Sequence, residues 1–255
     1  MRRPFIAGNW KMNLTRAEAV ALATEIAARA DNVAHVDLAI CPPSVYLDAV
    51  GTAIEGSAVG LGAQNVYFES NGAYTGEISG TMLRDLGCRY VIVGHSERRH
   101  VLGETNEDVN RKVKVALDLG LTPIVCVGET LAEREAGKTG EVVSAQFSGS
   151  LADLNATQVE QLVIAYEPVW AIGTGKVATP EQAEQVHADL RTLLEKNYNT
   201  DVAGKVRIQY GGSVKPKNAV DLLSRDNIDG ALVGGASLDA ESFFGIVAGA
   251  PGGTS

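Results

Sequence analysis

The feature that most constrains the fold of this chain is a series of eight short apolar runs, each followed by a segment with a helical pattern. Most of the runs are continuously apolar, which is typical of strands buried on both faces of a parallel sheet. They lie at residues 5–10, 36–41, 59–63, 90–93, 123–127, 162–166, 206–210 and 230–233. Eight strand–helix units in one series predict an α/β fold, and this number is that of a (β/α)8 barrel of about 250 residues.

The helical segments carry recognisable start and stop signals. Thr15 is followed three residues later by Glu18, a capping-box spacing that predicts a helix over 15–30. Thr179-Pro180 predicts the start of another at 179–198, because proline is favoured at the first helical position. Further helices are expected at 43–54, 80–86, 105–119, 139–150, 217–223 and 238–248, with a short one after residue 95.

The series is not interrupted by a linker, so we expect a single domain over residues 1–255, with 249–255 a flexible C-terminal tail. An open doubly wound sheet is the structural alternative. That fold usually has fewer strands and often carries an early GxGxxG motif, which is missing from this sequence.

Composition narrows the classes of partner and location. Acidic residues outnumber basic residues by 31 to 22, whereas a nucleic-acid-binding protein is expected to carry a basic face. No run reaches the roughly 20 apolar residues of a membrane helix, and no secretory signal is recognised. The three cysteines, Cys41, Cys88 and Cys126, form no CxxC pair, so we expect reduced thiols in a cytoplasmic protein without nucleic-acid or membrane partners.

The carboxyl ends of the predicted strands, where barrel enzymes place their active sites, carry two candidate acid–base groups. Glu167 follows an apolar run and precedes Pro168, which favours extended backbone at the glutamate. A carboxylate in apolar surroundings has a raised pKa and is a candidate base. A salt-bridged glutamate is the structural alternative. His95 precedes the expected short helix, whose N-terminus favours a neutral imidazole able to donate a hydrogen bond to a carbonyl. A purely structural histidine is the alternative.

Lys11 lies at the end of the first strand, next to Asn9, and supplies a cation for an anionic substrate. Two alternatives stay open for this lysine. It can be a solvated surface residue, or a nucleophile that forms a Schiff base.

Two glycine-rich loops follow the seventh and eighth strands, at 211–213 and 234–237. Backbone N–H groups at a helix N-terminus bind a phosphate dianion, and glycine allows it to come close. Either loop alone would be read as a tight turn, but the two together predict a phosphate site.

The segment after Glu167 has the composition of a lid, with a proline at one side, Gly-Thr-Gly at the other and bulky apolar residues between them. A lid of this kind covers a site and excludes water, whereas a packed surface loop is the alternative. Its residues are Pro168, Val169, Trp170, Ala171, Ile172, Gly173, Thr174, Gly175 and Lys176.

Together these groups predict proton transfer next to a carbonyl of a small phosphorylated substrate. A carboxylate base, a neutral hydrogen-bond donor, a lysine, a phosphate cradle and a lid are the parts such a reaction needs. We recognise no cluster of metal ligands and no dinucleotide fingerprint, so the sequence predicts a reaction without metal or cofactor.

The same residues resemble the triosephosphate isomerase family, and the matching stretches span residues 7 to 238 in the family's order. No catalytic position departs from the family pattern, and five such stretches together are highly specific. They are Ala-Gly-Asn-Trp-Lys-Met-Asn at 7–13, Gly-His-Ser-Glu-Arg-Arg at 94–99, Ala-Tyr-Glu-Pro-Val-Trp-Ala-Ile-Gly-Thr-Gly at 165–175, Tyr-Gly-Gly-Ser-Val at 210–214 and Leu-Val-Gly-Gly-Ala-Ser-Leu at 232–238.

The resemblance implies a TIM barrel that interconverts glyceraldehyde 3-phosphate and dihydroxyacetone phosphate through an enediolate, in glycolysis and gluconeogenesis. Glu167 would move the proton between the two carbons, and His95 would polarise the carbonyl and shuttle protons between the oxygens. Lys11 and Asn9 would stabilise the developing oxyanion. Ile172 and Leu232 would form an apolar clamp over the glutamate. The backbone N–H groups expected to bind the phosphate are those of Gly173, Ser213, Gly234 and Gly235.

The resemblance also implies a homodimer, in which the loop at 64–77 around Thr75 inserts into the partner beside Asn9 and Lys11. Two other functions remain as alternatives. One is a phosphate-binding aldolase that uses Lys11 through a Schiff base. The other is a phosphosugar binder without catalysis, which loss of Glu167, His95 or Lys11 would have favoured.

Overall fold

The computed structural model describes residues 2–172 and 176–252, and its eight parallel strands form a closed barrel in sequence order. Pairing of β1 with β8 closes the barrel, with Phe5 opposite Gly230. The strands are Phe5–Asn9 (β1), Asp37–Cys41 (β2), Val59–Ala63 (β3), Tyr90–Val93 (β4), Thr122–Val127 (β5), Val163–Tyr166 (β6), Arg207–Tyr210 (β7) and Gly230–Val233 (β8). The predicted barrel is therefore confirmed, and a closed barrel excludes the doubly wound alternative.

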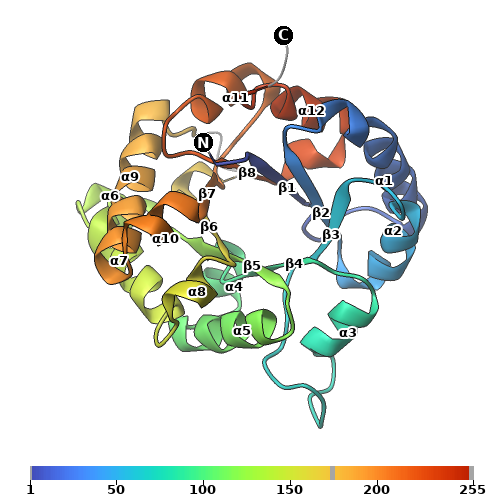
Figure 1. The fold of residues 1–255 in the computed structure, drawn as a ribbon, viewed down its shortest axis with the longest axis horizontal. Helices are drawn as coiled ribbons and strands as arrows, with labels where there is room; N and C mark the ends of the chain where they lie inside the picture. Colours follow the sequence, from blue (N-terminus) through green and yellow to red (C-terminus); the bar gives the residue numbers. More distant parts are fainter. Residues whose placement is uncertain (1, 173–175, 253–255) are drawn as a thin grey trace.

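The helices form a ring outside the barrel (Figure 1). They are Arg16–Ala30 (α1), Leu47–Ala53 (α2), Gly80–Asp85 (α3), Ser96–Val101 (α4), Asn106–Asp118 (α5), Leu131–Glu135 (α6), Thr139–Ser150 (α7), Ala156–Val159 (α8), Pro180–Asn197 (α9), Thr200–Lys205 (α10), Pro216–Leu223 (α11) and Ala240–Val247 (α12). The capping box expected at Thr15 and Glu18 is present.

Two helix predictions need correction. The helix expected over 43–54 is a 3-10 turn at Ser44–Tyr46 followed by α2. The one expected from residue 238 begins at Ala240, because Gly235–Leu238 form a separate 3-10 turn. The short helices α6, α8 and α10, of four to six residues, have no counterpart in the predictions, since so few residues give a weak helical period.

The apolar residues form two layers, as the alternation of side chains along each strand requires. One cluster fills the barrel and includes Phe5, Ala7, Ile92 and Cys126. The other lies between the strands and the helices. On β3, a Cβ atom on Gly60 would lie 2.5 Å from the Tyr90 ring, so a glycine is required to leave room for that interior side chain.

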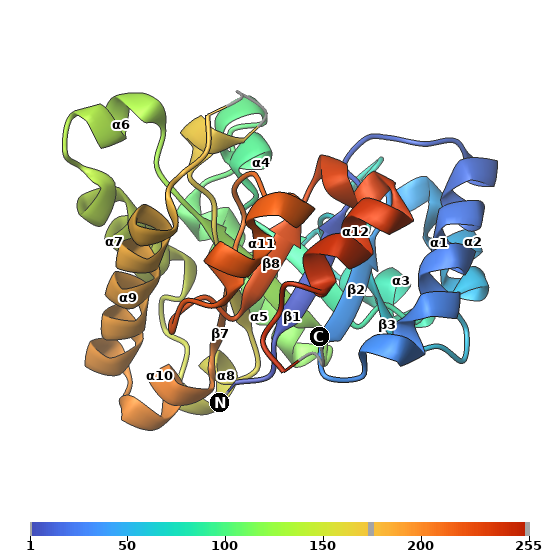
Figure 2. The same cartoon turned by 90° about the horizontal axis from the view of Figure 1, so that it is seen from above.

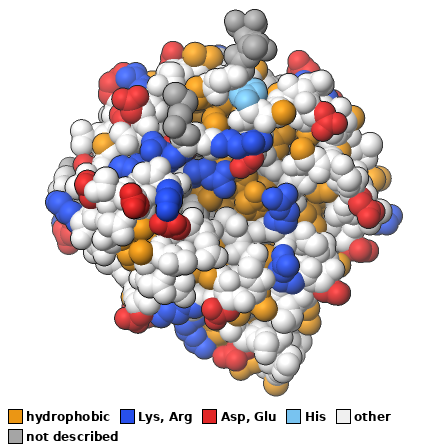
Figure 3. Space-filling model, in the orientation of Figure 1, with side chains coloured by type: hydrophobic (Ala, Val, Ile, Leu, Met, Phe, Trp, Pro, Cys, Tyr) orange, Lys and Arg blue, Asp and Glu red, His pale blue; other side chains and the backbone are white. Residues whose placement is uncertain are grey.

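Both chain termini lie at one end of the barrel, opposite α4 and α6 (Figure 2). Lys and Arg side chains gather near the centre of the face that carries the termini (Figure 3), and several of them form ion pairs. Arg3 and Arg207 both pair with Asp37, and Arg191 pairs with Asp229, which precedes β8. These ion pairs tie the first residues, β2, β7 and β8 together at this end.

Gly249 and Ala250 continue from α12 in turns, and Ala250 is buried. The flexibility expected for the tail at 249–255 stays a prediction. In the described ranges, every helix is too short or too polar to span a bilayer.

Candidate active site

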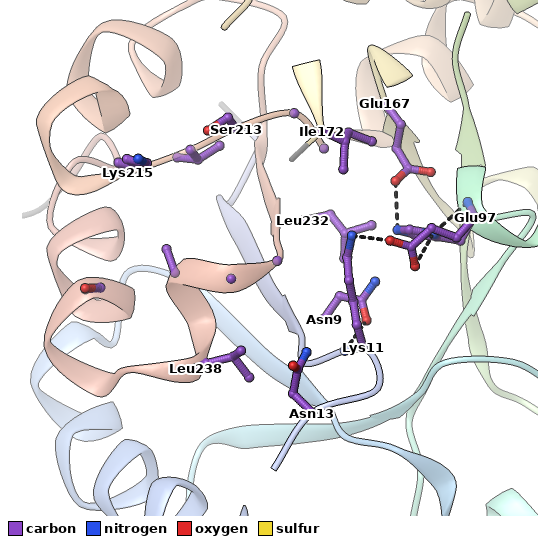
Figure 4. A pocket seen from close by; sticks show the side chains of 18 of the residues that line it. Asn9, Lys11, Asn13, Glu97, Glu167, Ile172, Ser213, Lys215, Leu232 and Leu238 are labelled. Atoms are coloured by element: carbon purple, nitrogen blue, oxygen red, sulfur yellow. Dashed lines mark hydrogen bonds and ion pairs between the residues drawn. The ribbon is translucent and has the colours of Figure 1, made fainter. Parts of the chain in front are cut away.

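A cavity of about 810 Å³ opens at the carboxyl ends of the strands. It brings together side chains from the ends of β1, β4, β6 and β8 and from the loop after β7 (Figure 4). The residues that we predicted for the site and that line it are Asn9, Lys11, His95, Glu167, Ile172, Ser213, Leu232, Gly234 and Gly235. The predicted binding residue Gly173 lies outside the described residues.

Glu167 and His95 face each other inside this cavity. The Glu167 Oε1 and His95 Nε2 atoms are 2.9 Å apart, and both side chains are buried. The Glu167 N–H donates to the carbonyl of Val127 at 2.8 Å, so the strand pairing of β5 and β6 extends to the glutamate. A Cβ atom on Gly128 would lie 1.8 Å from the Glu167 carbonyl oxygen, so this close approach requires glycine.

The sequence-based expectation of a raised pKa for Glu167 is wrong for this arrangement. Burial alone raises the pKa of the carboxyl. The charge and hydrogen bond of His95, together with the Ser96 N–H at 2.9 Å and the charge of Lys11, outweigh burial and lower the pKa below its ordinary value. These donors therefore keep the carboxylate ionised, and the apolar sequence before Glu167 does not predict them.

The hydrogen bonds of His95 fix its tautomer. The Glu97 N–H, in the first turn of α4, points at His95 Nδ1 at 3.2 Å, and a backbone N–H can only donate. Nδ1 therefore carries a lone pair, and the ring proton is on Nε2, facing Glu167. Burial lowers the pKa of His95, but the charge and hydrogen bond of Glu167 raise it above its ordinary value overall. The Nδ1 contact thus favours the predicted neutral donor, whereas the Glu167 carboxylate favours the protonated ring.

Lys11 reaches the cavity from an unusual backbone conformation, with φ of 52°. Its N–H donates to Asn9 Oδ1 at 3.0 Å, and Gln64 Nε2 donates to its carbonyl at 2.9 Å. The Lys11 ammonium is 2.6 Å from Glu97 Oε1.

The two glycine-rich loops line the same cavity as Glu167, with Ser213 across the cavity from it (Figure 4). Gly211 adjoins the glutamate, since a Cβ atom there would lie 2.8 Å from Glu167 Cγ. Ser213 lies on the loop before α11. Gly234 and Gly235 begin the 3-10 turn Gly235–Leu238, in which Ser237 Oγ donates to the Gly234 carbonyl at 2.7 Å. The loops that the sequence suggested as a phosphate cradle thus converge on one wall of the cavity.

The first part of the predicted lid is packed against the barrel. Val169–Ala171 form a 3-10 turn, and the Trp170 Nε1 donates to Glu129 Oε1 at 2.9 Å. Glu129 is fully buried and also accepts from the hydroxyl of Tyr166, at 3.1 Å. Ile172 and Leu232 lie on the side of the cavity next to Glu167 (Figure 4). Of the other lid residues, Thr174 and Gly175 are outside the described ranges, and Lys176 is exposed.

In residues 2–172 and 176–252, no group of three or more His, Cys, Asp or Glu side chains is arranged to hold a metal ion.

Comparison with known proteins decides the family. The sequence model of triosephosphate isomerase matches residues 4–250. The triosephosphate isomerase of Carboxydothermus hydrogenoformans is 56% identical over 249 residues, which are 98% of this chain and 99% of that protein. The chain belongs to the triosephosphate isomerase family. Two further members are those of Rhodopirellula baltica, 55% identical over 98% of both chains, and Moorella thermoacetica, 55% identical over 97% of this chain and 98% of that one. As a member of this family, the chain is an isomerase that interconverts triose phosphates.

Three residues of this isomerase site were not assigned a role from the sequence. Ser96 supplies the N–H that binds Glu167, Glu97 pairs with Lys11, and Glu129 anchors the start of the lid. Ser96 and Glu97 directly follow His95, so their position beside a predicted strand end was an available signal. Glu129 likewise follows the predicted strand 123–127 by two residues, but its partners Tyr166 and Trp170 are 37 and 41 residues away along the chain.

Proposed function

We propose that Glu167 is the base that moves a proton between two carbons in the interconversion of D-glyceraldehyde 3-phosphate and dihydroxyacetone phosphate through an enediolate. The observation that carries this assignment is the buried Glu167 carboxylate, 2.9 Å from His95 Nε2, in a cavity that also holds Lys11 and both glycine-rich loops. A substrate carbonyl that enters between these groups finds a carboxylate on one side and an N–H donor on the other.

His95 and Lys11 have complementary roles in this proposal. The Nε2 proton of His95 donates to the substrate carbonyl and later passes between the two oxygens. The Lys11 ammonium and the Asn9 side-chain amide stabilise the oxyanion that develops, an effect that fixed dipoles and charges supply efficiently in a dry site. The side-chain oxygen of Asn9, Oδ1, already accepts from the Lys11 N–H, which leaves the side-chain NH2 group to face substrate.

The phosphate would bind to the backbone N–H groups of Ser213, Gly234, Gly235 and Gly173. Closure of the lid over the site, with Ile172 and Leu232 against Glu167, would exclude water and raise the basicity of the carboxylate. The Glu129 contacts with Tyr166 and Trp170 support this role, because they hold the first lid residues against the barrel.

The experiment that tests the proposal compares wild type with Glu167→Asp in the isomerisation of glyceraldehyde 3-phosphate, coupled to NADH oxidation by glycerol-3-phosphate dehydrogenase. Shortening the side chain by one methylene withdraws the base by about 1 Å, which is expected to lower kcat about 100-fold or more with little change in KM. Glu160→Asp is the matched control, since Glu160 pairs with Lys205 outside the cavity.

Two other outcomes have distinct meanings. Unchanged kcat in Glu167→Asp would remove the base assignment. An inactive, folded wild type that still binds 2-phosphoglycolate would favour the binder without catalysis.

We also propose that the chain forms a homodimer through the loop between β3 and α3, which contains Thr75 and extends beyond the helix ring (Figure 1). Large apolar side chains are exposed on the loop after β1 (Met12, 95%), in the 3-10 turn after β2 (Val45, 78%) and at the end of α4 (Val101, 76%). A second cavity of about 430 Å³, lined in part by Lys11, Met12 and His95, offers a place for the partner's loop. An active monomer in sedimentation velocity would contradict this proposal.

A cytoplasmic location is part of the same proposal. Its support is the set of three buried, unpaired thiols, Cys41, Cys88 and Cys126, which a reducing compartment would maintain.

A further inference from the structure

Arg99, on the short helix α4, has its guanidinium directed toward the barrel, where it makes four hydrogen bonds. Its Nε donates to the Gly94 carbonyl at 2.8 Å and its Nη1 to Asn106 Oδ1 at 2.7 Å. Its Nη2 donates to the Cys126 carbonyl and to Ser150 Oγ, both at 3.1 Å. A planar guanidinium with this many directed donors fixes the relative positions of its acceptors.

Two of those acceptors are next to the reacting groups. Gly94 directly precedes His95 in the chain. Cys126 precedes Val127, whose carbonyl accepts the Glu167 N–H at 2.8 Å. One guanidinium therefore connects the loop that carries His95 to the strand edge that positions Glu167.

Gly94 is also held at its backbone N–H. Its N–H donates to Glu104 Oε2 at 3.0 Å, and Arg98 donates to Glu104 Oε1 at 3.1 Å. Gly94 has φ of 66°, and a Cβ atom there would lie 2.8 Å from Arg99 Nη2, so the backbone has the conformation of a glycine pressed against the guanidinium. Gly94, the residue before His95, is thus held at both its N–H and its carbonyl.

We propose that Arg99 is a positioning residue that sets the His95–Glu167 geometry for proton transfer. The proposal rests on the proposed roles of those two residues. Arg99 acts through them, since its four acceptors are two backbone carbonyls, a side-chain amide and a hydroxyl, none of which is assigned to substrate. A lysine at this position would keep the charge, but its single ammonium cannot reproduce the fork that spans Gly94 and Cys126.

The test measures kcat and KM of wild type, Arg99→Lys and a matched control, Arg191→Lys. Arg191 is also partly buried and donates to the carbonyls of Ala203 and Val206 and to Asp229, but at the terminal end of the barrel. A displacement of the donor of about 1 Å costs about 100-fold in rate, so kcat of Arg99→Lys is expected to fall by that order with KM and inorganic phosphate binding nearly unchanged. Arg191→Lys is expected to lower stability and keep wild-type kcat per folded site.

A double-mutant cycle with His95→Gln separates positioning from general destabilisation. If Arg99 acts through His95, Arg99→Lys should cost far less in the His95→Gln background than in wild type. Equal losses of kcat in both backgrounds, or wild-type kcat in Arg99→Lys, would overturn the proposal. If Arg99→Lys does not fold by circular dichroism, Asn106→Ala takes its place. It removes the acceptor of Nη1, together with a longer contact of Asn106 Nδ2 with the Ala145 carbonyl at 3.5 Å, and should lower kcat in the same direction. Unchanged kcat in folded Asn106→Ala would then overturn it.

These outcomes are distinct from failure of the proposed function. A wild type without isomerase activity, or full activity in His95→Gln, would refute the assigned roles before the Arg99 comparison is made.

Discussion

The buried histidine His187, on α9, makes the stability of this protein depend on pH in a way that can be calculated. It is fully buried, and its Nδ1 lies 3.2 Å from the carbonyl of Asn227. In the described part of the chain its Nε2 has no hydrogen-bond partner. Burial, with a smaller contribution from the charge of Arg191, lowers the pKa of His187 from 6.5 to about 3.

The sign follows from comparing the folded and unfolded states. Above pH 6.5 the imidazole is neutral in both, so it has no effect on the pH dependence. As the pH falls below 6.5 the unfolded chain binds a proton that the folded chain rejects until about pH 3, so the folded state loses stability. The loss is about 1.4 kcal/mol per pH unit, or about 2 kcal/mol between pH 6.5 and 5.

The assay is urea unfolding at fixed protein concentration from pH 7.5 to 5, for wild type, His187→Asn and the exposed-histidine variant His100→Asn. Asparagine keeps a donor near Asn227. Loss of the imidazole ring changes the free energy of unfolding by the same amount at every pH, so it does not alter the pH dependence. His95 has a raised pKa, which stabilises the folded state at low pH and opposes this trend, but it is present in all three proteins and cancels. His187→Asn should therefore gain about 2 kcal/mol on wild type over this range. Parallel pH profiles of wild type and His187→Asn would refute the reasoning.

Two further predictions concern the active site. Deleting the lid between Ile172 and Lys176 should raise the fraction of substrate lost by phosphate elimination, because an exposed enediolate phosphate can expel phosphate. An unchanged ratio of isomerised to eliminated product would contradict this prediction. Binding of 2-phosphoglycolate should raise the pKa of Glu167, because a ligand between Glu167 and His95 replaces a donor with an anion. Infrared difference spectra of the carboxyl band, with Glu167→Asp as reference, would show protonation, and an unaltered band would contradict the expectation.

The barrel was predictable because its determinants are local. Continuous apolar runs specify strands buried on both faces, and a stretch of about six residues is enough to recognise one. The deviations are also local in origin: the first strand ends at Asn9, one residue before the predicted Trp10, although the Trp10 N–H still donates to the Cys41 carbonyl at 3.1 Å. The helices α8 and α10 were missed because four and six residues form too few turns for a hydrophobic period to appear.

The membership of the site was predictable for a different reason. Strands of a parallel barrel bring their carboxyl ends to one rim, so Lys11, His95 and Glu167 had to lie near one another once the strands were placed. The contacts within the site were not predictable in this way. Glu97 is 86 positions from Lys11 along the chain, and their 2.6 Å ion pair depends on the rotation of α4 and on the φ of 52° at Lys11.

The pKa shift of Glu167 was predicted in the wrong direction, because the sequence indicates burial of the carboxylate but not the distant groups that contact it. The apolar run before the glutamate reveals the cost of burying its charge, and that cost does raise the pKa. The Ser96 N–H and the His95 ring, which reverse the sign, come from a loop 71 residues away. Because the same imidazole proton that now stabilises Glu167 is the one proposed to polarise the substrate carbonyl, substrate must separate the pair. When the His95–Glu167 hydrogen bond is replaced by one from His95 to the substrate carbonyl, Glu167 loses a donor that keeps it a weak base.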